Sequence, residues 1–218
     1  MAAFRLALEQ GADGVELDVR LTGTGDLIVC HDTTLERLAG GARVRIASTG
    51  LWALRQYDLG GGERVPLLAD VLALMRWHFV NVEVKSDDVD VVPLVRAVIA
   101  TLAWFRWRGP AVIVSSFEPR ILTELRAHAP WLRRGLLLPV ETMELADVTA
   151  RARGVAPHAI HPHHSVCTPE RVRTWRAQGL DVNTWTVDRD EDVRRVAIAG
   201  VTTIISNLPA DAIAAMSG

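Results

Sequence analysis

The sequence predicts an α/β protein of the (β/α)8 class, a TIM barrel, whose first strand is missing from the 218-residue chain. Strand-like apolar runs alternate with helical patterns almost to the end of the chain. This is typical of right-handed βαβ units around a parallel sheet. Seven barrel strands can be counted. The sequence contains no Gly-x-Gly-x-x-Gly turn, the motif that would indicate an open dinucleotide-binding sheet. A TIM barrel usually needs about 250 residues. We therefore expect one strand and its loop to lie before Met1, which would be an internal or misassigned start.

The expected strands come in a regular order. A first strand, GVELDVR, is joined by a short hairpin to a second extended segment, 26–31. The run AVIVSS at 111–116 is continuously apolar, as in parallel strands that are buried on both faces. The barrel strands are expected at 14–20, 79–85, 111–116, 134–139, 158–161, 181–187 and 201–206.

Helical patterns fill the intervals between these strands. The chain opens directly in a helix, and Pro66 stands near the first turn of another, a position where helices tolerate proline. Residues 33–66 are looser and rich in Gly and Arg, with one short helical segment at 51–57. The other helices are expected at 66–77, 89–105, 118–129, 141–153, 168–178 and 190–198, and from Pro209.

Composition indicates one globular domain over residues 1–218. Hydrophobic residues make up 49% and charged residues 23%, and there is no linker, repeat or low-complexity tract. The net charge of −2 argues against a nucleic-acid-binding protein. No apolar run reaches the roughly 20 residues of a membrane span, and MAAFRLALEQ lacks a signal core. Cys30 and Cys167 are too few for a disulfide framework, so we expect a cytoplasmic protein.

Alternation along two strands predicts a cluster of acids inside the barrel. Glu16, Asp18 and Arg20 share one face of the first strand, and Glu83 and Lys85 share one face of the next. The apolar face packs against the outer helices, so the charged face points inward near the carboxyl ends of the strands. Converging acids need a cation to offset repulsion and desolvation, and oxygen ligands favour Mg²⁺ or Ca²⁺.

A salt-bridge ladder is the alternative interpretation. Arg20 and Lys85 could neutralise the acids without any metal ion. Two acidic strands facing one interior favour the metal site. His31 ends the second extended segment and is followed by Asp32, so it could exchange a proton beside the metal.

Six ordered segments carry a resemblance to the glycerophosphodiester phosphodiesterase family. They span nearly the whole chain, which makes the resemblance specific. The segments are FRLALEQGADGVELDVRLTGTGDLIVCHDTTLERL, VPLLADVLAL, NVEVK, VSSF, GLDVNTWTVD and GVTTIISNLP. The resemblance implies a TIM barrel that uses a divalent cation to hydrolyse glycerophosphodiesters to glycerol 3-phosphate and an alcohol.

The resemblance also implies roles for seven residues. Glu16, Asp18 and Glu83 match the metal ligands of the family. His31 matches one of its two catalytic histidines, and Lys85 matches the lysine beside the metal. Phe117 and Trp185 match aromatic positions that wall the substrate pocket.

One departure from the family predicts weak activity. Family members begin with a strand that ends in His-Arg-Gly, followed by Glu-Asn-Thr, and this chain begins inside the helix that comes next. The second histidine and a phosphate-binding arginine are therefore absent from the sequence. We expect a phosphodiesterase that is impaired in this form, and the alternative is a non-catalytic barrel that binds a cation or a phosphodiester.

Two further groups of residues are interpreted as structural. The histidines of PHAIHPHHSV are expected on a pocket rim or surface loop, although such a cluster could bind zinc or nickel. Five tryptophans near arginines are expected to snorkel and pack into the core rather than stack on nucleic acid. These tryptophans are Trp77, Trp104, Trp107, Trp131 and Trp175.

Overall fold

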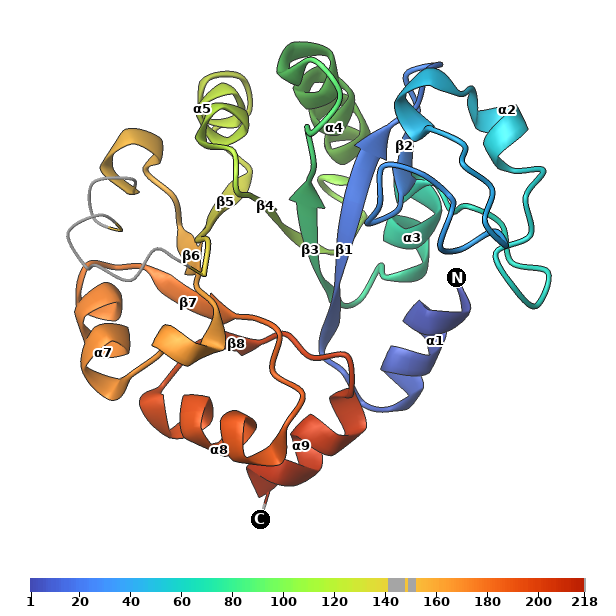
Figure 1. Cartoon of the computed structure of the whole chain (residues 1–218). Helices are drawn as coiled ribbons and strands as arrows, with labels where there is room; N and C mark the ends of the chain where they lie inside the picture. The colour runs from blue at the N-terminus through green and yellow to red at the C-terminus, as the bar shows by residue number, and fades with distance from the viewer. Residues whose placement is uncertain (141–147, 149–151, 218) are drawn as a thin grey trace.

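The computed structural model describes residues 1–140, 148 and 152–217 and contains one curled sheet (Figure 1). Its strands follow the order β2-β1-β3-β4-β5-β6-β7-β8, and all neighbouring pairs are parallel except β1 and β2. The strands are β1 (Gly14–Leu21), β2 (Leu27–Val29), β3 (Phe79–Val84), β4 (Ala111–Ser116), β5 (Arg133–Leu137), β6 (Ala159–His161), β7 (Asp181–Thr184) and β8 (Thr203–Ile204). The seven expected barrel strands are thus present.

The sheet has the architecture of a TIM barrel that is open on one side. β1 pairs with β3 from Gly14 to Val19, and its carboxyl end pairs with the antiparallel β2. Within the described part of the chain, β8 pairs only with β7, so no strand connects it to β1. The predicted fold class is confirmed, and β2 is the hairpin arm rather than a barrel strand.

Helices cover the outer face of the sheet (Figure 1). Several begin where the sequence supplies a cap: the Asp90 side chain accepts a hydrogen bond from the Val92 amide, and Thr168 accepts from Arg171. Most of the helix expected at 141–153 lies outside the described residues. The helices are α1 (Ala2–Glu9), α2 (Leu51–Leu54), α3 (Leu68–Leu74), α4 (Val91–Phe105), α5 (Pro119–His128), α7 (Pro169–Ala177), α8 (Asp190–Ala199) and α9 (Pro209–Ser217). Every described helix is too short or too polar to cross a lipid bilayer.

Two apolar clusters build the core. The larger one joins the outward faces of the strands to the surrounding helices, and it contains Leu17, Val19, Val82 and Val84 as the alternation predicts. The smaller one lies under residues 33–66 and is built around β2. It contains Ile28, Cys30, Leu35, Ile46, Leu54 and Val65. This second cluster anchors the segment that carries His31.

The expectation that five tryptophans snorkel and pack into the core is wrong for three of them. Trp175 is 2% exposed and packs in the larger cluster, and Trp131 is partly buried against it. Trp77, Trp104 and Trp107 are instead 81%, 84% and 82% exposed. They lie at or just beyond the carboxyl ends of α3 and α4, where the helix leaves the sheet and the chain turns back into a strand.

The expectation of a rim position is wrong for one histidine. His161 is fully buried inside the barrel, 3.1 Å from the Asn183 amide nitrogen. Burial lowers the pKa of His161 to about 3, so its imidazole is neutral at physiological pH. Gly135 on β5 leaves room for this ring, because a Cβ atom at that position would lie 2.3 Å from His161 Nε2.

We therefore predict that Gly135→Ala destabilises the barrel by about 1–3 kcal/mol, as overpacking of a filled interior does. The matched control is Gly154→Ala, because a Cβ atom at Gly154 would meet nothing within 4 Å. Chemical denaturation with urea measures both variants. Equal midpoints for the two variants would contradict the packing of His161 against Gly135.

Candidate functional site

Three carboxylates meet at the carboxyl ends of β1 and β3. Asp18 and Glu83 are direct neighbours across the parallel pair, and Glu16 lies one step back on the same face of β1. One carboxylate oxygen of each residue lies within 4.8 Å of the others. The alternation of the two strands produces this convergence, because it sends the valines and leucines outward to the helices.

Burial governs the protonation of this cluster. Burial, together with the smaller effects of the Asp18 and Glu83 charges, raises the pKa of Glu16 to about 8. Burial also raises the pKa of Glu83. Protonation is therefore the way in which Glu16 avoids a third negative charge when no cation is near.

Lys85 supplies the positive charge of the cluster. Its Nζ lies 2.8 Å from Glu83 Oε1 and 3.1 Å from Asp18 Oδ1. Burial acts to lower the pKa of Lys85, but the hydrogen bond and charge of Glu83 outweigh it, so the pKa is raised. One ammonium group faces three carboxylates, which leaves the cluster short of positive charge.

The donor set fits a hard divalent cation. Glu16 Oε1 is buried and has no hydrogen-bond partner among the described residues, which is costly for a carboxylate oxygen. Glu16, Asp18 and Glu83 offer only oxygen ligands, as Mg²⁺ and Ca²⁺ prefer. The salt-bridge ladder accounts for Lys85 but leaves Glu16 without a partner.

Arg20 does not join the ladder that the sequence suggested as the alternative. Its guanidinium is buried and donates two hydrogen bonds to the His31 carbonyl oxygen, from Nε at 2.9 Å and Nη2 at 2.7 Å. Nη2 also donates to Asp87 Oδ2 at 2.7 Å. Arg20 therefore ties the end of β2 to the loop after β3 and fixes the backbone of His31.

The side chain of His31 stands at the mouth of the site. It is 63% exposed, and its Nδ1 lies 2.8 Å from Asp32 Oδ1. Arg37 Nε donates to Asp32 Oδ2 at 2.7 Å. The hydrogen bond from His31 is the main cause that lowers the pKa of Asp32. With Nδ1 held in this way, Nε2 is the nitrogen that can exchange a proton with a ligand.

Two aromatic rings also line the site. Phe117 and Trp185 make an edge-to-face contact with centroids 5.7 Å apart. The Trp185 indole donates from Nε1 to the His161 carbonyl oxygen at 2.8 Å, which fixes the plane of the ring. The sequence singled out both aromatic residues, and the structure places them beside the carboxylates.

All seven residues that the sequence singled out line one cavity of about 230 Å³. The sequence reasoning overlooked four other lining residues: Asn81, Leu137, Thr186 and Ile205. Asn81 could have been found, because it shares the inward face of β3 with Glu83. Its side-chain oxygen accepts a hydrogen bond from the Ser115 hydroxyl at 2.9 Å.

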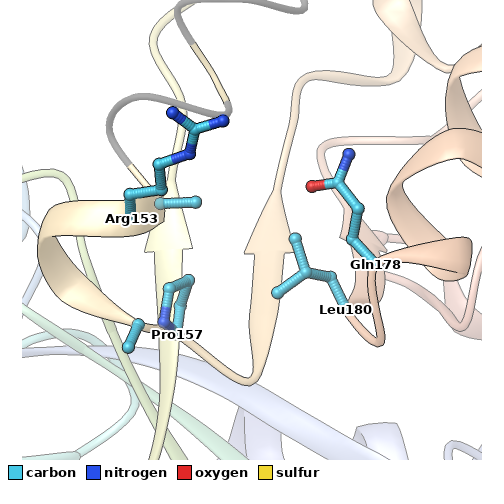
Figure 2. Close-up of a pocket in the computed structure, with 6 residues that line it drawn as sticks. Arg153, Pro157, Gln178 and Leu180 are labelled. Carbon is cyan, nitrogen blue, oxygen red and sulfur yellow. The ribbon is translucent and has the colours of Figure 1, made fainter.

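A larger hollow of about 410 Å³ lies at the opposite end of the strands. Figure 2 shows Arg153 and Pro157 on one side and Gln178 and Leu180 on the other. Its described lining contains no carboxylate and no histidine. The smaller cavity is therefore the better candidate for chemistry.

Comparisons with known proteins agree with the geometry of this cavity. Residues 1–211 match the glycerophosphoryl diester phosphodiesterase family. A glycerophosphodiester phosphodiesterase from Caldanaerobacter subterraneus subsp. tengcongensis is 34% identical over 96% of this chain and 88% of its own length. The crystal structure of the Thermotoga maritima glycerophosphodiester phosphodiesterase covers 98% of this chain and 89% of its own, with 26% identity and a TM-score of 0.78.

A third protein shares the fold at lower identity. The phosphodiesterase from Oleispira antarctica, solved in complex with its product sn-glycerol-3-phosphate, superposes with a TM-score of 0.89. The match covers 100% of this chain and 90% of that one at 24% identity. This comparison therefore supports the fold of the barrel.

The raised pKa of Glu16 predicts how stability depends on pH in the presence of EDTA. The folded state holds a proton up to about pH 8, whereas the unfolded chain releases it near pH 4.5. The free energy of unfolding should therefore fall as pH rises through this window, by roughly 3–5 kcal/mol. Glu16→Gln should remove most of this fall, as measured by urea denaturation at several pH values.

The exposed Glu170 on α7 provides the control. Glu170→Gln should keep the pH dependence of the parent protein. Parallel curves for the parent and Glu16→Gln would show that Glu16 does not hold a proton in the folded state.

Proposed function

Because this chain belongs to the glycerophosphodiester phosphodiesterase family of phosphoric diester hydrolases, we propose that it hydrolyses glycerophosphodiesters to glycerol 3-phosphate and an alcohol. The observation that carries this proposal is the meeting of Glu16, Asp18 and Glu83 with His31 in one cavity. Such a cavity provides acidic ligands for a cation, a fixed positive charge and a group for proton transfer. These are the requirements for cleaving an anionic phosphodiester.

The three carboxylates would hold one divalent cation, Mg²⁺ or Ca²⁺. When bound, the cation would polarise a phosphoryl oxygen and offset the negative charge that develops during displacement. The buried and unpartnered Glu16 Oε1 supports this assignment. On binding the cation, Asp18 and Glu83 would give up part of their ion pairing with Lys85.

Lys85 and His31 would act on the substrate itself. Lys85 is held between Asp18 and Glu83, so its ammonium group is placed to attract a phosphoryl oxygen. His31 would exchange a proton through Nε2, because Asp32 occupies Nδ1. The Arg20 contacts to the His31 carbonyl would keep the backbone of this residue in place.

Phe117 and Trp185 would border the organic part of the substrate. Their edge-to-face contact presents a rigid apolar wall beside the cavity. The carbon backbone of a glycerol group suits such a wall, whereas the phosphate would face the carboxylates through the cation.

We expect slow turnover by the 218-residue chain. Among the described residues that line the cavity, His31 is the single histidine. In-line displacement places the attacking and leaving oxygens on opposite sides of phosphorus, so one imidazole cannot serve both. The loss of one partner in such a pair lowers the rate by about 10²–10⁴-fold.

We further propose a cytoplasmic setting, because Cys30 and Cys167 are both buried and free.

Glycerol 3-phosphate release from glycerophosphocholine, with Mg²⁺ or Ca²⁺ and with EDTA, tests the proposed activity. We predict slow, cation-dependent release that Glu83→Gln lowers by about 100-fold or more. Glu170→Gln, on the exposed face of α7, should match the parent. Cation binding without any release would favour the non-catalytic barrel instead.

His31→Asn tests the proton-transfer role separately. We predict a drop in kcat of about 10²–10⁴-fold with a smaller change in KM, since the residue acts on the reacting atoms. His128→Asn is the matched control, because His128 is an exposed histidine on α5. Equal losses in kcat for the two variants would contradict the assignment of His31.

A further inference from the structure

Tryptophan and arginine side chains gather at the end of the barrel opposite the cavity. The last turns of α4 and α5 and the loops that lead into β3, β4 and β5 carry them, and these three strands are neighbours in the sheet. We call this surface the tryptophan–arginine rim. It consists of Trp77, Trp104, Trp107 and Trp131 with Arg76, Arg106, Arg108 and Arg126.

Cation–π contacts organise the rim. The Arg106 guanidinium lies 4.8 Å from the ring centroids of both Trp107 and Trp131, which joins the loop before β4 to the loop before β5. Arg76 lies 4.6 Å from the Trp77 ring in the loop before β3. These contacts hold indole rings and guanidinium groups side by side at the surface.

The charged side chains of the rim are all positive. The segments 75–80, 103–116 and 125–140 contain six arginines and no Asp or Glu, although the whole chain has a net charge of −2. Arg133 pairs with Asp181 and Arg134 is buried. In the described part of the chain, the four arginines of the rim have no carboxylate within 4.0 Å.

The fold itself does not explain this surface. An arginine at a helix carboxyl end offsets the helix dipole, and this accounts for Arg126 in the last turn of α5. It does not account for three indole rings that are more than 80% exposed. Exposed tryptophans beside unpaired arginines are typical of surfaces that contact the headgroup region of a membrane.

We infer that the tryptophan–arginine rim docks this protein on the surface of an anionic phospholipid bilayer. The arginines would contact lipid phosphates, and Trp77, Trp104 and Trp107 would enter the headgroup region without spanning the bilayer. Docking through this end leaves the opposite, catalytic cavity open to the aqueous phase. The inference rests on the exposed side chains and not on the proposed reaction.

A second copy of the chain fits the rim less well. A symmetric dimer would bring the same patch of both subunits together. The four unpaired arginines of one copy would then face the four of the other, and like charges across an interface oppose association. An anionic lipid surface complements these charges.

Vesicle co-sedimentation tests the docking surface. The probes are vesicles of phosphatidylcholine with about 30 mol % phosphatidylglycerol and vesicles of phosphatidylcholine alone. The parent protein should bind the anionic vesicles, and high salt should weaken binding. Arg106→Glu with Arg108→Glu should lower the partition coefficient by about 25-fold or more. Trp104→Ala with Trp107→Ala should lower it by about ten-fold.

Matched controls separate the rim from general effects of charge and exposure. Arg173→Glu with Arg194→Glu changes the net charge equally at two exposed positions on α7 and α8, and Trp52→Ala removes an indole that is 79% exposed on α2. Both controls should bind vesicles like the parent. All variants should keep the circular dichroism spectrum and the release of glycerol 3-phosphate from glycerophosphocholine measured for the parent.

Three results would overturn the inference. The first is equal binding of the parent to neutral and anionic vesicles, or no binding to either. The second is a loss in the control variants as large as the loss in the rim variants. The third is a parent protein that is dimeric in analytical ultracentrifugation and a Trp104→Ala, Trp107→Ala variant that is monomeric. This result would assign the rim to a second copy of the chain.

Discussion

The concentration of negative charge inside an apolar barrel is the constraint on which the rest of the structure depends. Glu16, Asp18 and Glu83 have oxygens within 4.8 Å of one another, and Lys85 provides a single ammonium group against them. Such a cluster destabilises a fold unless a proton or a cation relieves the repulsion. Without a cation, the protein relieves the repulsion by keeping Glu16 protonated, as its raised pKa indicates. A bound cation would achieve the same relief and make the site reactive.

Much of the surrounding structure holds this cluster and its neighbours in place. The parallel pairing of β1 with β3 sets Asp18 beside Glu83, and the small apolar cluster around β2 supports the segment of His31. Arg20 links these two parts, because its guanidinium donates hydrogen bonds to the His31 carbonyl oxygen and to Asp87. The backbone of His31, which we propose as the proton-transfer group, is thus fixed relative to the carboxylates through buried contacts, and its exposed ring is held by Asp32.

The sequence predicted the barrel and the carboxylate cluster because both depend on simple periodicities. Alternation within a strand decides which side chains face the interior, and Glu16, Asp18 and Glu83 follow it. The role of Arg20 could not be found in this way, because its long side chain turns to partners on β2 and on the loop after β3. The exposed Trp77, Trp104 and Trp107 were also mispredicted, because they lie at or beyond helix ends, where helical periodicity no longer decides which side chains face the sheet.

The most direct test of the central claim is calorimetric titration of Mg²⁺ or Ca²⁺ into the purified chain at pH 7 in buffers of different ionisation enthalpy. Our account predicts one cation bound per chain, with release of a proton from Glu16. It also predicts that Glu16→Gln weakens binding and abolishes the proton release. The absence of saturable binding, or binding that Glu16→Gln leaves unchanged, would contradict the account.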